Sequence, residues 1–259
     1  VYAIVGTEGT PRLTVNFMNG DTEIASMIIK KADTEEEVNK IIYDPGAGTP
    51  DTGEVFKGWA TETNYTTDTD LLTIAQVRAA AMAKADLITT DDEITYYAGI
   101  FKSYTVTYQS DDASPITLGT ATVEYPAYKQ NAEVAYTVSM GYTVDDSHNF
   151  EGWIPNEASQ NHIKDYPAGA ASEAEVYYYT NSTGITITGD VTFTVRAPEG
   201  NWLIFDENGK GATYTSPQFV LKGNTTVTPS NINDMARNGY EFGGWYDTKE
   251  HANLGLRNL

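Results

Sequence analysis

One short aromatic motif occurs three times in this chain, and its spacing limits the possible folds more than any other feature. The pattern is Phe-x-Gly-Trp, at Phe56 to Trp59, Phe150 to Trp153 and Phe242 to Trp245. The three tryptophans lie 94 and 92 residues apart (153 − 59 and 245 − 153), which is close to the size of one small domain. A repeat of this length indicates similar units in series rather than one large fold. We therefore expect three modules in tandem within the 259 residues.

Each copy of the motif is expected to lie at the centre of a module's core. Phenylalanine and tryptophan bury large apolar areas and dominate the packing of small domains. We expect the two rings of a copy to share one face of a strand, and the glycine between them to leave room for a neighbouring backbone or ring. The predicted core residues are Phe56, Trp59, Phe150, Trp153, Phe242 and Trp245.

The composition excludes several kinds of stabilisation and of partner. The chain has no cysteine, so neither disulfides nor thiolate metal sites are available, and 18 Tyr, 8 Phe and 4 Trp supply the apolar area instead. The net charge of −20 repels phosphate backbones and anionic lipid surfaces, which argues against nucleic acid as a partner. Because no apolar run approaches the roughly 18 residues that a spanning helix needs, we expect no membrane insertion.

Strands of similar pattern are expected to open and to close the modules. Opening strands, each followed by a turn rich in Asn, Asp and Gly and by a second strand, are predicted at 13–17, 104–108 and 202–205. Closing strands are predicted at 94–100 and 191–195. The predicted boundaries are 1–9 for the closing strand of a preceding module, 10–102 for the first module, 103–199 for the second and 200–259 for an incomplete third. The strand at 1–5 then frays, packs against the first module or completes the third module of another molecule.

Two capping boxes predict helices in the first module. Thr34 with Glu37 precedes a short apolar stripe, and Thr73 with Gln76 precedes a longer one whose members Ile74, Val77, Ala81 and Ala85 share a face. Residues 136–140 of the second module occupy the place of the first helix but alternate like a strand, and residues 230–237 occupy that place in the third.

The stretch Gly239 to Asp247 follows a predicted hairpin and reads Gly-Tyr-Glu-Phe-Gly-Gly-Trp-Tyr-Asp. This stretch resembles the Listeria–Bacteroides repeat family, which includes the B-repeats of internalin surface proteins. The resemblance covers the chain as two full copies and one partial copy. It implies β-grasp-like sheets with a packed helix, in which each closing strand lies parallel to the opening strand of its own module. Such modules are carried in tandem on secreted or wall-anchored bacterial proteins as spacer or adhesive modules. No catalytic residues come with it.

Candidate sites outside the motif are few. The three histidines, His148, His162 and His251, lie in polar stretches without a paired Ser or Cys motif and are expected to be surface residues. The segment 206–211 begins like a calcium loop but has Lys210 where an oxygen ligand belongs, so a turn explains it better. The acidic runs at 66–70 and 111–112 are expected to be solvated loops. The best aromatic clusters are 125–128 and the three tyrosines proposed as a speculative ligand-binding site, Tyr177, Tyr178 and Tyr179.

Together these features predict a strand-rich α+β fold of tandem small β-grasp-like modules, each a mixed sheet with one or two short helices. They favour a non-enzymatic repeat region of a secreted or wall-anchored bacterial surface protein, extracellular and acting as a stalk, spacer or adhesin. The alternative is a glycan- or protein-binding accessory region of an extracellular hydrolase. No cofactor or metal is expected, the candidate partners are host glycan or host protein, and the chain is expected to be a monomeric fragment of a longer one.

Overall fold

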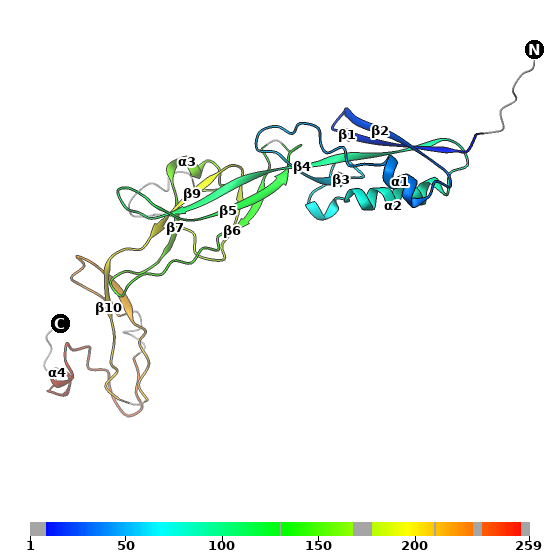
Figure 1. The fold of residues 1–259 in the computed structure, drawn as a ribbon. Coiled ribbons are helices and arrows are strands. Elements are labelled where there is room, and N and C mark those ends of the chain that lie inside the picture. The colour runs from blue at the N-terminus through cyan, green and yellow to red at the C-terminus, as the bar shows by residue number, and fades with distance from the viewer. Residues whose placement is uncertain (1–8, 130, 168–177, 210, 230–234, 255–259) are drawn as a thin grey trace, which may run out of the picture.

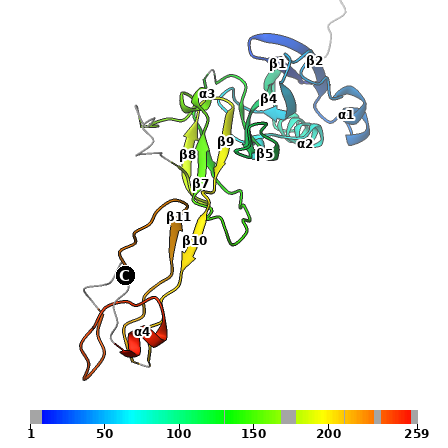
Figure 2. The same ribbon diagram turned by 90° about the vertical axis from the view of Figure 1, so that its left-hand side faces the viewer.

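The computed structural model describes residues 9–129, 131–167, 178–209, 211–229 and 235–254 (Figure 1). The fold is strand-rich α+β, with mixed sheets and a few short helices, as the sequence predicts. The modules follow one another along an extended, bent path, which Figures 1 and 2 show from two sides. The predicted strand at 1–5 lies outside the described residues, as do residues 230–234 of the predicted third-module segment.

The first module contains both predicted helices. Its elements are β1 (Arg12–Asn19), β2 (Thr22–Lys30), α1 (Glu35–Ile41), β3 (Val55–Ala60), the 3-10 turn η1 (Asp68–Asp70), α2 (Ile74–Ala85) and the first part of β4 (Asp92–Gln109). Both capping boxes are confirmed: Thr34 caps α1 together with Glu37, and Thr73 caps α2 together with Gln76. Val77, Ala81 and Ala85 of α2 are buried, and Ile74 packs partly buried against the same core.

The second module has strands where the first has a helix. Its elements after β4 are β5 (Thr117–Pro126), β6 (Val134–Thr137), β7 (Gly152–Pro155), α3 (Glu157–Gln160), β8 (Gly184–Ile187) and β9 (Val191–Arg196). The strand predicted at 136–140 in the place of the first helix is present only in part, because β6, which pairs with β8, ends at Thr137. The third region contributes a two-stranded sheet of β10 (Gly200–Leu203) and β11 (Gln218–Leu221), and the short helix α4 (Lys249–Leu254).

The strand pairing repeats from the first module to the second. In the seven-stranded sheet β1 lies parallel to the first half of β4, with Phe17 opposite Tyr96, and the second half of β4 lies parallel to β9, with Tyr108 opposite Phe193. Each closing strand therefore pairs in parallel with its own module's opening strand, which confirms the predicted pairing. The hairpin strands β2 and β5 flank the opening strands in antiparallel fashion.

The aromatic cores of the two modules also correspond. Trp59 packs edge-on against Phe17 at 4.5 Å between ring centroids, and Trp153 packs in the same way against Tyr108 at 4.7 Å. Phe17 stacks on Tyr96, and Tyr108 stacks on Phe193. The indoles of Trp59 and Trp153 are both 0% exposed. Each module is therefore organised around its own three-ring cluster.

The glycine of the motif allows a second chain segment to cross the tryptophan. Gly58 and Gly152 both have φ +151°, a conformation that side chains disfavour. A Cβ on Gly58 would lie 2.9 Å from the carbonyl oxygen of Leu72, and one on Gly152 would lie 2.6 Å from that of Tyr179. The close backbone approach expected at the motif is confirmed in both modules.

The paired phenylalanine reaches the tryptophan because the strand bulges. Phe56 and Trp59 are three positions apart, which in a regular strand would place their rings on opposite faces. The register of β3 against β4 shifts between Phe56 and Gly58, so that Phe56 lies opposite Ile100 and Trp59 opposite Ala98. The extra residue returns both rings to one side, with centroids 5.1 Å apart.

The third copy of the motif differs from the expectation of a buried core. Phe242 and Trp245 have ring centroids 5.6 Å apart, much like the other copies, but Phe242 is 40% exposed and Trp245 is only partly buried. Among the described residues nothing lies within 4 Å of a Cβ placed on Gly244. The predicted opening strand at 202–205 is present only in part, because β10 ends at Leu203. The crossing segment that encloses the tryptophan in the first two modules has no counterpart within the described part of the third.

Replacing the motif glycine in the second module tests the close approach. Gly152→Ala should lower the free energy of unfolding by about 1–3 kcal/mol, because the backbone conformation is strained for alanine and the Cβ meets the carbonyl of Tyr179. Gly184→Ala is the matched control, since its Cβ meets nothing within 4 Å, and it should change stability by less than about 0.5 kcal/mol. Urea unfolding followed by circular dichroism measures both variants, and equal losses would contradict the crossing geometry.

Two core tyrosines of β4 make a second test. The hydroxyl of Tyr96 is buried and has no hydrogen-bond partner among the described residues, and its burial raises the pKa of this phenol, whereas the hydroxyl of Tyr108 lies 2.7 Å from that of Tyr136. Tyr96→Phe should leave stability unchanged or raise it by about 1 kcal/mol, because it removes an unsatisfied polar group. Tyr108→Phe should cost about 0.5–1.5 kcal/mol. Thermal unfolding of the two variants, measured side by side, tests this difference. A larger loss of stability in Tyr96→Phe than in Tyr108→Phe would contradict the prediction.

Candidate functional site at the joint between the first two modules

The first two modules are joined by a single strand. The closing strand predicted at 94–100 and the opening strand predicted at 104–108 are two halves of β4, which is 18 residues long and runs from the first core to the second within one seven-stranded sheet. We call the region around Phe101, where β4 passes from one module to the next, the joint. β5 pairs with β4 from Gln109 back to Phe101, and β3 pairs with it from Tyr97 to Phe101, so the joint has antiparallel neighbours on both sides.

A tyrosine from the first module fixes the joint. The hydroxyl of Tyr65 donates to the carbonyl of Ile100 at 2.9 Å and accepts from the N–H of the same residue at 2.8 Å. The side chain is buried, and this burial raises the pKa of the Tyr65 phenol. Its ring packs against Phe101 at 5.6 Å. The loop that carries Tyr65 is thereby held to the middle of β4.

The second module reaches back to the same loop. Tyr128, which follows β5, donates its hydroxyl to the carbonyl oxygen of Tyr65 at 2.6 Å, and its ring lies edge-on to Tyr65 at 5.2 Å. The N–H of Ala127 donates to the carbonyl of Ile100. Contacts from both modules therefore meet on one short stretch of β4.

Ion pairs cross the joint as well. Lys57 of β3 pairs with Glu124 of β5, and Lys102 of β4 lies 3.1 Å from a carboxylate oxygen of Glu54. The hydrogen bond to Glu54 raises the pKa of Lys102. Exposed pairs of this kind stabilise weakly, so they orient the joint more than they strengthen it.

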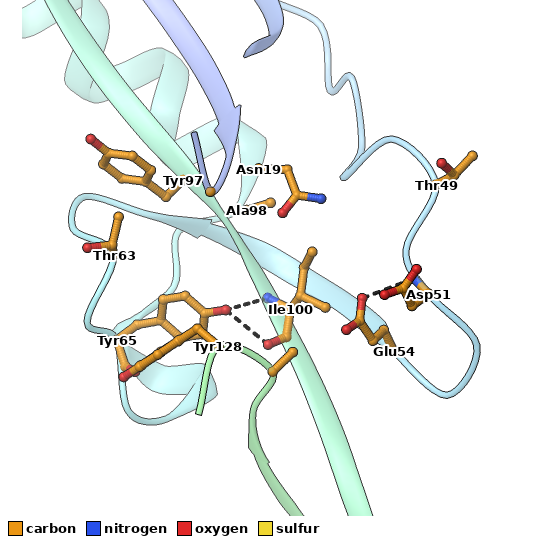
Figure 3. Close-up of a pocket in the computed structure, with 12 residues that line it drawn as sticks. Asn19, Thr49, Asp51, Glu54, Thr63, Tyr65, Tyr97, Ala98, Ile100 and Tyr128 are labelled. Atoms are coloured by element: carbon orange, nitrogen blue, oxygen red, sulfur yellow. Dashed lines mark hydrogen bonds between the residues drawn. The ribbon is translucent and has the colours of Figure 1, made fainter. Parts of the chain in front are cut away.

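A pocket of about 320 Å³ opens on the first-module side of the joint. Five separate chain segments line it, and Figure 3 shows tyrosines along one wall and Thr49, Asp51 and Glu54 along the other. The lining side chains are those of Asn19, Thr49, Asp51, Glu54, Thr63, Tyr65, Tyr97, Ala98, Ile100, Ala127 and Tyr128. Of these, only Tyr128 belongs to an aromatic cluster visible in the sequence. The others lie far apart along the chain, and no local pattern marks them.

Of the three tyrosines predicted as a ligand site, the two that the structure describes do not share one surface. Tyr177 lies outside the described residues, Tyr178 is 40% exposed and Tyr179 is 5% exposed within the core of the second module. Tyr179 exchanges backbone hydrogen bonds with Trp153, while Tyr178 lies beside Arg196. The alternation of side chains along an extended segment separates these two rings. Of the two, Tyr178 is the one at the surface.

The polar loops show local roles. In the loop at 145–148 the histidine ring nitrogen Nδ1 of His148 lies near both Ser147 and Asp145, but the serine hydroxyl donates to Asp145. A catalytic triad needs the serine and the carboxylate on opposite ring nitrogens. These hydrogen bonds lower the pKa of Asp145 to about 2. The loop is therefore a hydrogen-bonded turn.

The acidic run at 66–70 closes the turn η1. The carboxylate of Asp70 accepts from the backbone N–H groups of Thr66 and Thr67, and these hydrogen bonds lower its pKa. The described residues hold no group of three or more His, Asp or Glu side chains placed to bind a metal ion. The same part of the chain has no helix that is both long and apolar enough to span a bilayer.

The described residues form a strand-rich fold in which β4 supplies the closing strand of one core and the opening strand of the next. Residues 203–254 match the model of the Listeria-Bacteroides repeat domain, which confirms the family resemblance on the third copy of the motif. Repeats of this family are typical of bacterial surface proteins and are generally non-catalytic. No curated protein matches the sequence.

Removing one hydroxyl tests the joint. Tyr65→Phe deletes both hydrogen bonds to Ile100 and should lower the free energy of unfolding by about 1–3 kcal/mol, because the N–H of buried Ile100 loses its acceptor while the carbonyl keeps only its bond from Ala127. Tyr43→Phe is the control, since Tyr43 is 56% exposed, and it should change stability by less than about 0.5 kcal/mol. Guanidinium unfolding distinguishes them, and a neutral Tyr65→Phe would show that the hydroxyl does not hold the joint.

Proposed function

We propose that this chain is a non-enzymatic repeat region of a secreted or wall-anchored bacterial surface protein, and that its tandem modules act as a stiff spacer. The modules are those predicted at 10–102, 103–199 and 200–259, with the first boundary inside β4. The single observation that carries the proposal is the continuity of β4 from the first core to the second within one seven-stranded sheet.

A shared strand makes a stiffer connection than a linker. Domains joined by flexible polar linkers move relative to one another unless their interface is large. Here the connecting residues are themselves hydrogen-bonded to β3 and β5, and Tyr65 and Tyr128 hold the flanking loops to them. Bending at the joint would break ladder hydrogen bonds and separate buried rings.

The charge suits a spacer in a crowded surface layer. A net charge of −20 keeps neighbouring copies apart and soluble. The alternative role is that of an accessory region of an extracellular hydrolase, and the same modules are compatible with it. Hydrolase activity in an adjoining region would distinguish this role from that of a spacer.

The stiffness is measurable with two spin labels, because the chain has no cysteine of its own. Leu87→Cys in the first module and Glu157→Cys in the second are exposed labelling positions. Pulsed electron paramagnetic resonance should give one narrow distance distribution between them. Inserting Gly-Gly after Lys102, within the joint, should broaden that distribution at least twofold.

Inserting Gly-Gly between Asp111 and Asp112 is the control. This exposed turn lies beyond the joint, so the insertion should leave the distribution narrow. Circular dichroism of each variant establishes that both modules stay folded. A distribution already broad without any insertion would refute the stiff spacer.

A further inference from the structure

We propose that the pocket at the joint binds the end of a neutral glycan, a role that goes beyond that of a spacer. The pocket has about 320 Å³, near the lower end of the roughly 300–1,000 Å³ typical of small-molecule sites. It therefore fits a terminal sugar unit better than a long extended ligand. Its two walls differ in chemistry, and together they match a ligand that has an apolar face and many hydroxyl groups.

One wall consists of tyrosine rings that are held in place. Tyr65 is fixed by its hydrogen bonds to Ile100, and Tyr128 by its hydrogen bond to Tyr65. Figure 3 shows these two rings close together, with Tyr97 on the same side of the pocket. Tyr65 is 8% exposed and supports Tyr128, which is 45% exposed and offers apolar contact area at low entropic cost to the C–H face of a sugar.

The rest of the lining supplies hydrogen-bonding groups without partners. In the part of the chain described, the hydroxyls of Thr49, Thr63 and Tyr97 and the carboxylate of Asp51 make no hydrogen bond to other protein groups. Hydroxyls both donate and accept, and a carboxylate accepts from two or more donors. Sugar hydroxyls also donate and accept, so this mixed set complements them.

The charges on the pocket select among ligands. Asp51 and Glu54 disfavour ligands that carry phosphate, sulfate or carboxylate groups, and the nearby cation Lys102 is already paired with Glu54. A basic peptide is the competing ligand. The peptide is less favoured because both carboxylate oxygens of Glu54 already accept protein hydrogen bonds, one from Lys102 and one from the N–H of Asp51. In the described part of the chain, the side chain of Asp51 is then the one carboxylate in the pocket without a partner.

The test begins with the full 259-residue chain on an array of neutral, amino and acidic oligosaccharides. Neutral oligosaccharides should bind and acidic ones should not. Calorimetry then measures the affinity for the neutral oligosaccharide that binds. Asp51→Ala and Tyr128→Ala should each weaken it about tenfold or more, from the loss of a charge-assisted hydrogen bond and of an aromatic contact.

Tyr178→Ala is the matched control. Tyr178 is exposed, belongs to the second module and lies outside the pocket, so the variant should bind as the unchanged chain does. Asp51→Asn, which keeps the shape of the side chain, should lose affinity as Asp51→Ala does, and circular dichroism excludes unfolding as the cause.

Several outcomes would overturn the proposal: no oligosaccharide bound, equal affinity for acidic sugars, binding of a Lys-rich peptide in place of sugars, or binding lost only in Tyr178→Ala. The spin-label distances are independent of ligand. A stiff joint without glycan binding would therefore leave the spacer standing and remove only the pocket's role.

Discussion

The crossing of two backbones over the motif tryptophan is the contact on which the first two modules depend. Trp59 exchanges backbone hydrogen bonds with Leu72, and Trp153 does so with Tyr179. The exchange requires the preceding residue to lie flat against the crossing carbonyl, which only glycine allows. The crossing segment covers one side of the indole, and the opening and closing strands bury the rest of its area. The motif thus specifies a backbone arrangement as much as an apolar surface.

The shared strand extends this local arrangement over a longer distance. Because β4 supplies the last strand of one core and the first strand of the next, it carries Tyr96 as the closing-strand ring of the first cluster and Tyr108 as the opening-strand ring of the second. The geometry of each core therefore sets the orientation of its neighbour. The loops that carry Tyr65 and Tyr128 then meet at a fixed position, and the pocket at the joint arises from that meeting.

Much of the fold follows from local pattern. The capping pairs at Thr34 and Thr73 define both helix starts because a side chain three residues on completes each cap. The parallel pairing of closing with opening strands is expected from the family resemblance, and β1 with β4 and β4 with β9 confirm it. Local pattern does not predict the bulge at Lys57 or the fusion of two strands into β4, because contacts with partner strands set the register and the continuity of a strand. The pocket is invisible in the sequence for the same reason: Thr49, Thr63 and Tyr97 meet only after folding.

The parallel arrangement of β1, β4 and β9 has a mechanical consequence. A pull along the chain enters a module at the start of its opening strand and leaves at the end of its closing strand, and these two strands lie side by side in the same direction. Tension therefore slides one strand along the other, so that the row of hydrogen bonds between them is loaded all at once rather than opened one after another. A chain of such modules resists extension because its paired strands are loaded in shear. The shared strand transmits the full force from one module to the next.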